Sequence, residues 1–247
     1  MNRQLSALLV AVQFLTRVPV PRINGYSDEA QARSLCYYPL VGALLGLLLW
    51  LAPLPRDSVI LSAALLLLLW VVITGGLHLD GLADSADAWA GGQGDAARTL
   101  AIMKDPASGP LGVAAICLLL LVKFAAIQEL LRRDQAWLLM FPPILGRASI
   151  LALLLTTPYV RVGGLASAMS AGLPRLALWM VLAAVVAGIW IGLGMPGGWL
   201  LAGAVLCGSA LRWLMVVRIG GITGDTLGAS VEIIEMVALV LLVWSVA

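Results

Sequence analysis

The stretch that decides the fold runs from Val59 to Asp87 and reads VILSAALLLLLWVVIT-GG-LHLDGLADSAD. Its first part, through Thr74, carries no charge, as expected of a membrane-spanning helix. It is followed by the only histidine of the chain, His78, and by three aspartates. Carboxylates seldom stand beside a bilayer without a partner. The stretch therefore predicts a membrane helix that leads into a polar site.

The composition predicts an all-α, polytopic integral membrane protein. Hydrophobic residues make up 62% of the 247 residues, charged residues 11%, and the mean hydropathy is +1.02. Soluble domains have about 25% charged residues. A net charge of +2 is too small to indicate a nucleic-acid partner, so the lipid bilayer is the expected surrounding. Three cysteines far apart in apolar runs show neither a disulfide nor a metal-binding pattern.

Hydrophobic runs predict about six to seven transmembrane helices in a single domain over residues 1–247. Residues 4–16 are too short for a comfortable span, so they form either an interfacial helix or a short first span. Two polar loops are predicted, at about 78–108 and 218–230. The candidate spans are 36–53, 58–77, 110–131, 136–157, 176–194, 199–217 and 231–247.

Lysines and arginines orient these spans. More of them fall on the side that carries the N-terminus, which the positive-inside rule assigns to the cytoplasm. Arg132 and Arg133 lie on the opposite side and count against this orientation. Counting spans alternately places both polar loops on the same, cytoplasmic, face.

Asp80, Asp84 and Asp87 follow one another at i, i+4 and i+7, which puts them on one face of a helix. Like charges at these spacings repel, and a divalent cation removes that penalty. Carboxylate oxygens suit Mg²⁺, which binds few carboxylates and completes its shell with water and phosphate. The alternative is a solvated polar face. The small residues between the aspartates favour a packed or substrate-lined helix instead.

Several other polar residues have both a structural and a functional interpretation. A lone histidine such as His78 is more often structural, but its position suits phosphate contact or proton transfer. Arg98 and Lys104 are either surface anchors or phosphate-binding residues, with Asp105 as a further metal ligand. Arg147 stands mid-span and must face a partner or a cavity, so we expect it to meet a diphosphate or a carboxylate.

A second acidic cluster lies in GGITGDTLGASVEIIE, residues 220–235. Its glycines allow turns and the close approach of a ligand. Glu232 and Glu235 stand at the start of the last predicted span, where compensation of the helix dipole explains Glu232 better than the deeper Glu235. Thr223 and Thr226 either bind a phosphate or cap the helix.

Together these motifs resemble the cobalamin synthase family. The resemblance rests on TGGLHLDGLADSAD (74–87), IMKD (102–105) and GGxTGDTLGAxxExxE (220–235), with FLTRVPVP (14–21) and YPLVG (38–42) near the N-terminus. It implies a multi-pass transferase of the bacterial inner membrane whose site faces the cytoplasm. Other enzymes of cobalamin biosynthesis are candidate partners.

The reaction implied by the resemblance is a phosphoryl transfer. The adenosylcobinamide-phosphate moiety of adenosylcobinamide-GDP passes to α-ribazole or α-ribazole 5′-phosphate, with GMP as leaving group and Mg²⁺ as cofactor. The family pattern and the residue chemistry together assign Mg²⁺ to Asp80, Asp84, Asp87 and Asp225, catalysis to Asp87, Asp105 and His78, and substrate binding to Lys104, Arg98, Arg147, Thr223, Glu232 and Glu235.

Two other functions fit parts of the pattern. A cation- or proton-coupled transporter would use the acids as a relay, but such proteins usually carry charged or broken helices at the midplane and repeated halves. A non-catalytic membrane scaffold would not need Asp80, Asp84, Asp87 and Asp225 together.

Overall fold

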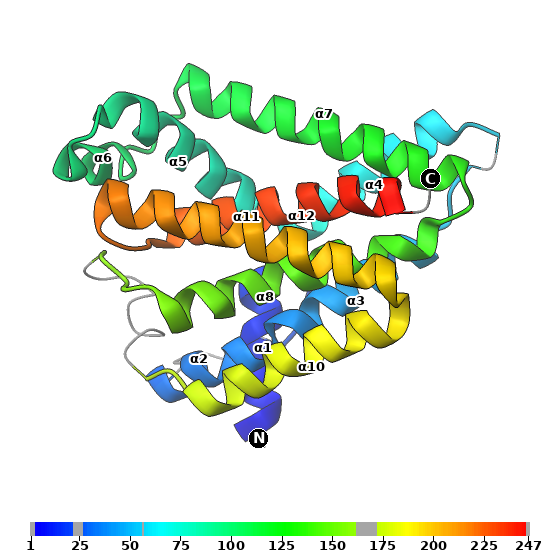
Figure 1. Cartoon of the computed structure of the whole chain (residues 1–247), viewed down its shortest axis with the longest axis horizontal. Coiled ribbons are helices and arrows are strands. Elements are labelled where there is room, and N and C mark those ends of the chain that lie inside the picture. The colour runs from blue at the N-terminus through cyan, green and yellow to red at the C-terminus, as the bar shows by residue number, and fades with distance from the viewer. Residues whose placement is uncertain (1–2, 22–26, 56, 162–171, 246–247) are drawn as a thin grey trace.

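The computed structural model describes residues 3–21, 27–55, 57–161 and 172–245, and these ranges are almost entirely helical. The long helices lie side by side as a bundle, with the polar helices α5 and α6 at one end (Figure 1). The helices, in chain order, are α1 (Arg3–Leu15), α2 (Asp28–Ser34), η1 (Leu35–Tyr37), α3 (Tyr38–Leu51), α4 (Val59–Thr74), α5 (Leu77–Gly92), α6 (Ala96–Ile102), α7 (Pro110–Arg132), η2 (Ala136–Met140), α8 (Phe141–Thr156), α10 (Arg175–Leu193), α11 (Met195–Ile219) and α12 (Gly224–Ser245).

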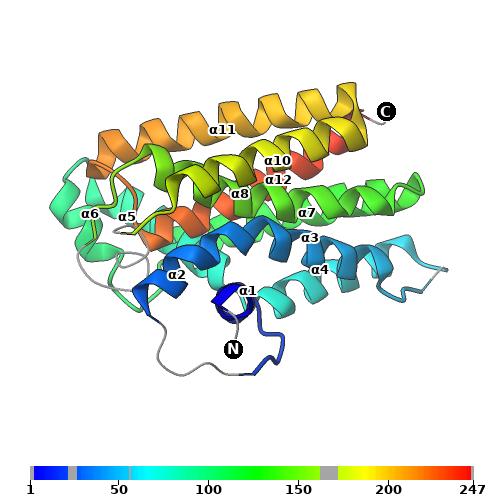
Figure 2. The same cartoon turned by 90° about the horizontal axis from the view of Figure 1, so that it is seen from below.

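The predicted class and number of spans are confirmed. Within the described ranges, six helical segments are long and apolar enough to cross a membrane, and α4 with α5 forms a seventh if the bent pair counts as one span. At 13 residues α1 is too short to be counted among them. It runs across the long helices instead of along them (Figures 1 and 2), which favours the interfacial alternative.

The two segments predicted as loops are mostly helical, which corrects the sequence interpretation. Residues 78–108 contain nearly all of α5 and the whole of α6. The last span begins at Gly224, seven residues before the predicted start at 231. The glycines of 220–235 suggested turns, and Gly220 ends α11 in a left-handed conformation with φ of 78°. Gly228 instead lies inside α12, where an added Cβ would make an ordinary contact with His78 at 3.4 Å.

A sharp bend separates the apolar helix α4 from the polar helix α5. Gly75 and Gly76 both have left-handed backbone conformations, with φ of 64° and 69°, which glycine adopts without strain. The two helix axes meet at 88°. The Arg17 side chain covers Gly75, and the Arg17 N–H donates to the Ile73 carbonyl at 2.7 Å. These two contacts from the segment after α1 stabilise the bend.

Two helices form the centre of the bundle. Over the most apolar 18 residues, the membrane-spanning segment that includes α8 is 72% buried and α12 is 67% buried, whereas α10 and α11 are each only 11% buried. Figure 2 shows α10 and α11 together on one flank of the bundle. The described residues contain no strand, only one isolated parallel bridge between Tyr159 and Ile222. That bridge fixes the segment after α8 beside the segment before α12.

Candidate functional site

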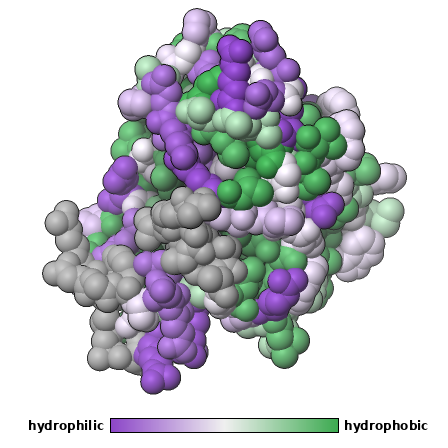
Figure 3. Space-filling view, turned by 90° about the vertical axis from the view of Figure 1, so that its left-hand side faces the viewer, coloured by the Kyte–Doolittle hydropathy of each residue, from purple (hydrophilic) through white to green (hydrophobic). Residues whose placement is uncertain are grey.

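Hydrophilic side chains gather on the end of the bundle that α5 and α6 form (Figure 3). The turn between α11 and α12 reaches the same end (Figure 1). The two polar regions that the sequence placed on one face are therefore adjacent, as predicted. The contact is close at Gly81, where an added Cβ would lie 2.6 Å from the Asp225 carbonyl oxygen.

Four aspartates share this end of the bundle. Asp80 is exposed and Asp84 half-buried, while Gly81, Ala83, Ser85 and Ala88 between and beside them are buried. The small residues therefore face the packed side of α5, as the sequence predicted. Asp80, Asp87 and Asp225 all lie close enough to Asp84 to act on it electrostatically, and so does Arg161.

These carboxylates form a site that is open for further ligands. Among the described residues, no three His, Cys, Asp or Glu side chains converge tightly enough to hold a metal ion by themselves. Mg²⁺ typically uses one or two carboxylates and completes its octahedral shell with water and substrate phosphates. One or two of the carboxylates of Asp80, Asp84 and Asp225 would suffice for that mode of binding. The assignment of Mg²⁺ stays a prediction.

Asp87 has a structural partner that the sequence did not reveal. Its Oδ2 accepts the Gly109 N–H at 2.6 Å and its Oδ1 accepts the Gly112 N–H at 2.9 Å. The N-terminus of α7 thus holds a carboxylate of the chain itself. Such a carboxylate accepts hydrogen bonds from the free N–H groups and is stabilised by the positive end of the helix dipole. Asp87 therefore joins α5 to α7.

Arg161 is the residue of this site that sequence reasoning missed. Its Nη1 donates to Oδ2 of Asp225 at 2.7 Å, with both side chains partly exposed. Tyr159 lies nearby, and burial raises the pKa of its phenol, which keeps it a neutral hydrogen-bonding group. The only signal in the sequence was the position of Arg161 on the same predicted face as the acids.

His78 lines a small cavity beside the aspartates. The cavity measures about 170 Å³, and Asp80 and Asp225 are its charged lining residues. Phe14, Tyr38 and aliphatic side chains also line it. His78 is 3% exposed, and within the described residues neither ring nitrogen has a hydrogen-bond partner. Buried polar atoms without partners are uncommon in folded proteins and indicate a place for a ligand.

A buried ion cluster lies deeper in the bundle. Lys123 Nζ donates to Glu232 Oε2 and to Glu235 Oε2, each at 2.6 Å, and stands over the Trp70 ring at 4.8 Å. Arg147 Nη1 donates to Glu235 Oε1, which confirms the predicted pairing of this arginine with a carboxylate. Glu232, Glu235 and Arg147 were predicted to bind substrate. The structure pairs them inside the protein, where charges need mutual compensation.

The remaining predicted residues lie just before α12 and in or just after α6. Thr223 is fully buried and its Oγ1 accepts the Thr226 N–H at 3.2 Å, so Thr223 caps the helix, one of its two predicted roles. Arg98, Lys104 and Asp105 are exposed at the end of α6. The Asp105 carboxylate accepts the Ala107 N–H at 3.0 Å. Arg98 and Lys104 form no ion pair within the described part of the chain, which leaves them accessible to an anion.

Comparisons with known proteins agree on one family. A family model described as cobalamin-5-phosphate synthase matches residues 7–243. A protein of Stutzerimonas stutzeri named adenosylcobinamide-GDP ribazoletransferase is 52% identical over 94% of this chain and 96% of its own length. Proteins of the same name from Pseudomonas entomophila and Ectopseudomonas mendocina are 50% and 51% identical, over 94% and 96% of this chain and 96% and 98% of their own. No solved structure matches the chain.

Proposed function

Because this chain belongs to the cobalamin-5-phosphate synthase family, we propose that its polar end catalyses the transfer of adenosylcobinamide phosphate from adenosylcobinamide-GDP to α-ribazole or α-ribazole 5′-phosphate. Membership makes the chain a transferase of late cobalamin synthesis. One observation supports this location of the site. Asp80 and Asp84 of α5 lie near Asp225 of α12, beside a cavity lined by the unpartnered His78.

The proposed step exchanges one phosphorus–oxygen bond for another. A ribose hydroxyl oxygen of the acceptor forms the new bond to the cobinamide-linked phosphorus, and the bond from this phosphorus to the oxygen of GMP breaks. The hydroxyl proton passes to a carboxylate of the site, and GMP leaves with the bonding electron pair. The protein must mainly position the two substrates and neutralise charge, as in other phosphoryl transfers.

The aspartates would hold the cofactor. Asp80, Asp84 and Asp225 are the residues we propose as Mg²⁺ ligands, and when bound the ion would neutralise the diphosphate of the donor. Asp87 is engaged by α7, so Asp105 and any carboxylate not bound to the ion are better placed to accept the proton. The accessible Arg98 and Lys104 are proposed to contact the phosphates.

The small cavity is proposed to seat the base of the acceptor. α-Ribazole carries a flat heteroaromatic base, and the lining of the cavity combines aromatic and aliphatic side chains with His78 and Asp80. Ligand sites commonly join a mostly apolar lining to a few polar groups that fix orientation. The unpartnered nitrogens of His78 would hydrogen-bond the acceptor, so His78 is proposed to bind and orient it.

The site is proposed to face the cytoplasm from the bacterial inner membrane. The distribution of lysines and arginines supports this orientation. Both nucleotide-type substrates would then reach the site from the cytoplasm without crossing the bilayer.

A direct assay tests the proposed function. The purified chain, in a lipid bilayer mimic, is incubated with adenosylcobinamide-GDP, α-ribazole phosphate and Mg²⁺, and both GMP and the corrinoid product are measured. We expect equal amounts of the two products and no turnover without Mg²⁺. A folded protein that forms neither product would overturn the enzymatic function, and turnover that persists in excess chelator would overturn the metal assignment.

A further inference from the structure

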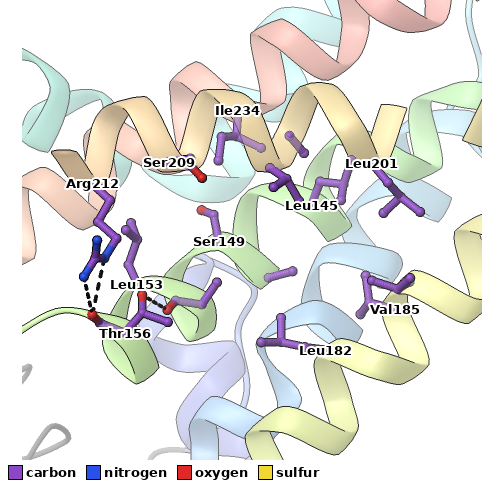
Figure 4. Close-up of a pocket in the computed structure, with 16 residues that line it drawn as sticks. Leu145, Ser149, Leu153, Thr156, Leu182, Val185, Leu201, Ser209, Arg212 and Ile234 are labelled. Atoms are coloured by element: carbon purple, nitrogen blue, oxygen red, sulfur yellow. Dashed lines mark hydrogen bonds between the residues drawn. The ribbon is translucent and has the colours of Figure 1, made fainter. Parts of the chain in front are cut away.

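A second, larger cavity lies between four membrane-spanning helices. It measures about 540 Å³, within the usual range of ligand pockets of roughly 300–1,000 Å³. Side chains of α8, α10, α11 and α12 form its walls, among them Leu153, Leu182, Leu201 and Ile234 (Figure 4). The small cavity beside His78 is lined by other residues, so the two cavities are distinct.

We refer to this larger cavity as the groove. One end of the groove carries a single positive charge. Arg212 Nη2 donates to the Thr156 carbonyl at 2.9 Å (Figure 4), and Nε donates to Thr157 Oγ1 at 3.1 Å. Both partners are neutral, and within the described ranges Arg212 has no carboxylate partner. Lys123 and Arg147 of the interior are each paired with a glutamate. The charge of Arg212 therefore stays uncompensated beside an apolar surface.

The groove lies beside the most exposed flank of the bundle. Val186 and Val205, on two of its walls, are 50% and 66% exposed. The helices that bear them, α10 and α11, are the least buried spans in the described chain. The groove thus presents an apolar channel parallel to lipid chains and a cation at the end where α8 finishes. That end also carries the candidate active site.

We propose that this groove binds one anionic phospholipid, with the headgroup phosphate on Arg212 and an acyl chain along α8 and α11. Basic pockets between transmembrane helices bind anionic headgroups by such contacts, and arginine pairs well with phosphate. A corrinoid fits the groove poorly, because its peripheral amides need hydrogen-bond partners. The walls offer few: the Ser149 hydroxyl already donates to the Gly146 carbonyl at 2.6 Å.

A bound chain would also support the fold. It would fill the cavity that the α10–α11 hairpin forms with the central helices α8 and α12. Occupied apolar space retains dispersion contacts that an empty groove loses. The lipid would therefore hold the hairpin in place without touching the proposed catalytic residues.

Native mass spectrometry with added lipid tests the proposal. The detergent-purified chain is titrated with phosphatidylglycerol, phosphatidylcholine or inorganic phosphate. We expect one phosphatidylglycerol per chain, weaker binding of phosphatidylcholine, and no binding of inorganic phosphate at the same concentration. Arg212→Ala should weaken phosphatidylglycerol binding about fivefold or more. Gly208→Leu should abolish it by filling the groove, because a Cβ at Gly208 meets only Ile234, at 3.7 Å.

Arg175→Ala is the matched control. This arginine stands at the same end of the bundle and donates to the Leu155 carbonyl at 2.8 Å, but does not line the groove. Phosphatidylglycerol binding equal to wild type in both Arg212→Ala and Gly208→Leu, or an equal loss in Arg175→Ala, would overturn the site. Displacement of the lipid by adenosylcobinamide would assign the groove to substrate instead. Thermal unfolding verifies that each variant is folded.

Discussion

The guanidinium of Arg161 lies 2.7 Å from the carboxylate of Asp225 and joins the segment after α8 to the first turn of α12. The two residues are far apart in sequence, and the parallel bridge between Tyr159 and Ile222 aligns their segments. One carboxylate oxygen of Asp225 is held by this pair, which fixes the orientation of the side chain.

Removing Arg161 should impair catalysis through the position of Asp225. A charge-assisted hydrogen bond contributes about 1.5–3 kcal/mol, so Arg161→Ala should lower kcat/KM at least about tenfold, and Arg161→Lys should recover part of the loss. Steady-state kinetics with a Mg²⁺ titration measures both. Arg33→Ala, which breaks an exposed pair with Glu29 on α2, is the control. Unchanged kinetics in Arg161→Ala would show that this ion pair does not contribute to catalysis.

The aspartates of α5 should be required for turnover and for the response to Mg²⁺. Asp80→Asn and Asp84→Asn remove ligand charge while keeping shape, and we expect each to reduce kcat/KM about a hundredfold or more and to raise the Mg²⁺ concentration for half activity. Asp134→Asn makes the same change at an exposed turn outside the site and should behave as wild type. Normal rates in both α5 variants would show that this face is merely solvated.

Asp87 should matter mainly for stability. Asp87→Ala removes the acceptor of two N–H groups at the start of α7 and should cost about 1–2 kcal/mol of unfolding free energy, as for lost helix caps. Denaturant unfolding in detergent measures the loss, and turnover is expressed per folded molecule. Unchanged stability with abolished turnover would instead support the predicted catalytic or metal-binding role.

The buried ion cluster should be a major determinant of stability. Lys123→Met leaves Glu232 without its cation in the interior, and breaking a buried pair typically costs about 3–5 kcal/mol. The variant should therefore unfold at lower denaturant concentration or fail to accumulate. Arg132→Met, at an exposed pair with Glu129, should change stability little. Should Lys123→Met be as stable as wild type, the cluster contributes no net stability.

Gly81 should tolerate no side chain. Gly81→Ala places a methyl group 2.6 Å from the Asp225 carbonyl oxygen, so α5 and α12 must separate. Overpacking of this kind costs about 1–3 kcal/mol, and activity should fall because Asp80 and Asp225 move apart. Gly188→Ala, with nothing within 4 Å of the added atom, should leave both properties intact. Equal behaviour of the two variants would exclude a close contact of α5 and α12.

The sequence by itself determined the membrane class, the approximate spans and the polar face. These follow from local properties: uncharged runs long enough for a bilayer, the i, i+4, i+7 spacing of aspartates, and small residues between them. The motifs also indicated the family, because they combine residue types with spacing. Sequence reasoning did not separate Gly220, which ends α11 in a left-handed conformation, from Gly228, which lies inside α12, because the two glycines have the same local pattern.

Only the tertiary structure decided which charges meet. Glu232 and Glu235 were expected to bind substrate. In the structure they pair in the interior with Lys123 and Arg147 from two other helices. Asp87 binds the N-terminus of α7, and Arg161 reaches Asp225. Each of these partners is distant in the chain. Residue spacing fixes the neighbours on one helix, whereas partners on different helices depend on how the helices pack.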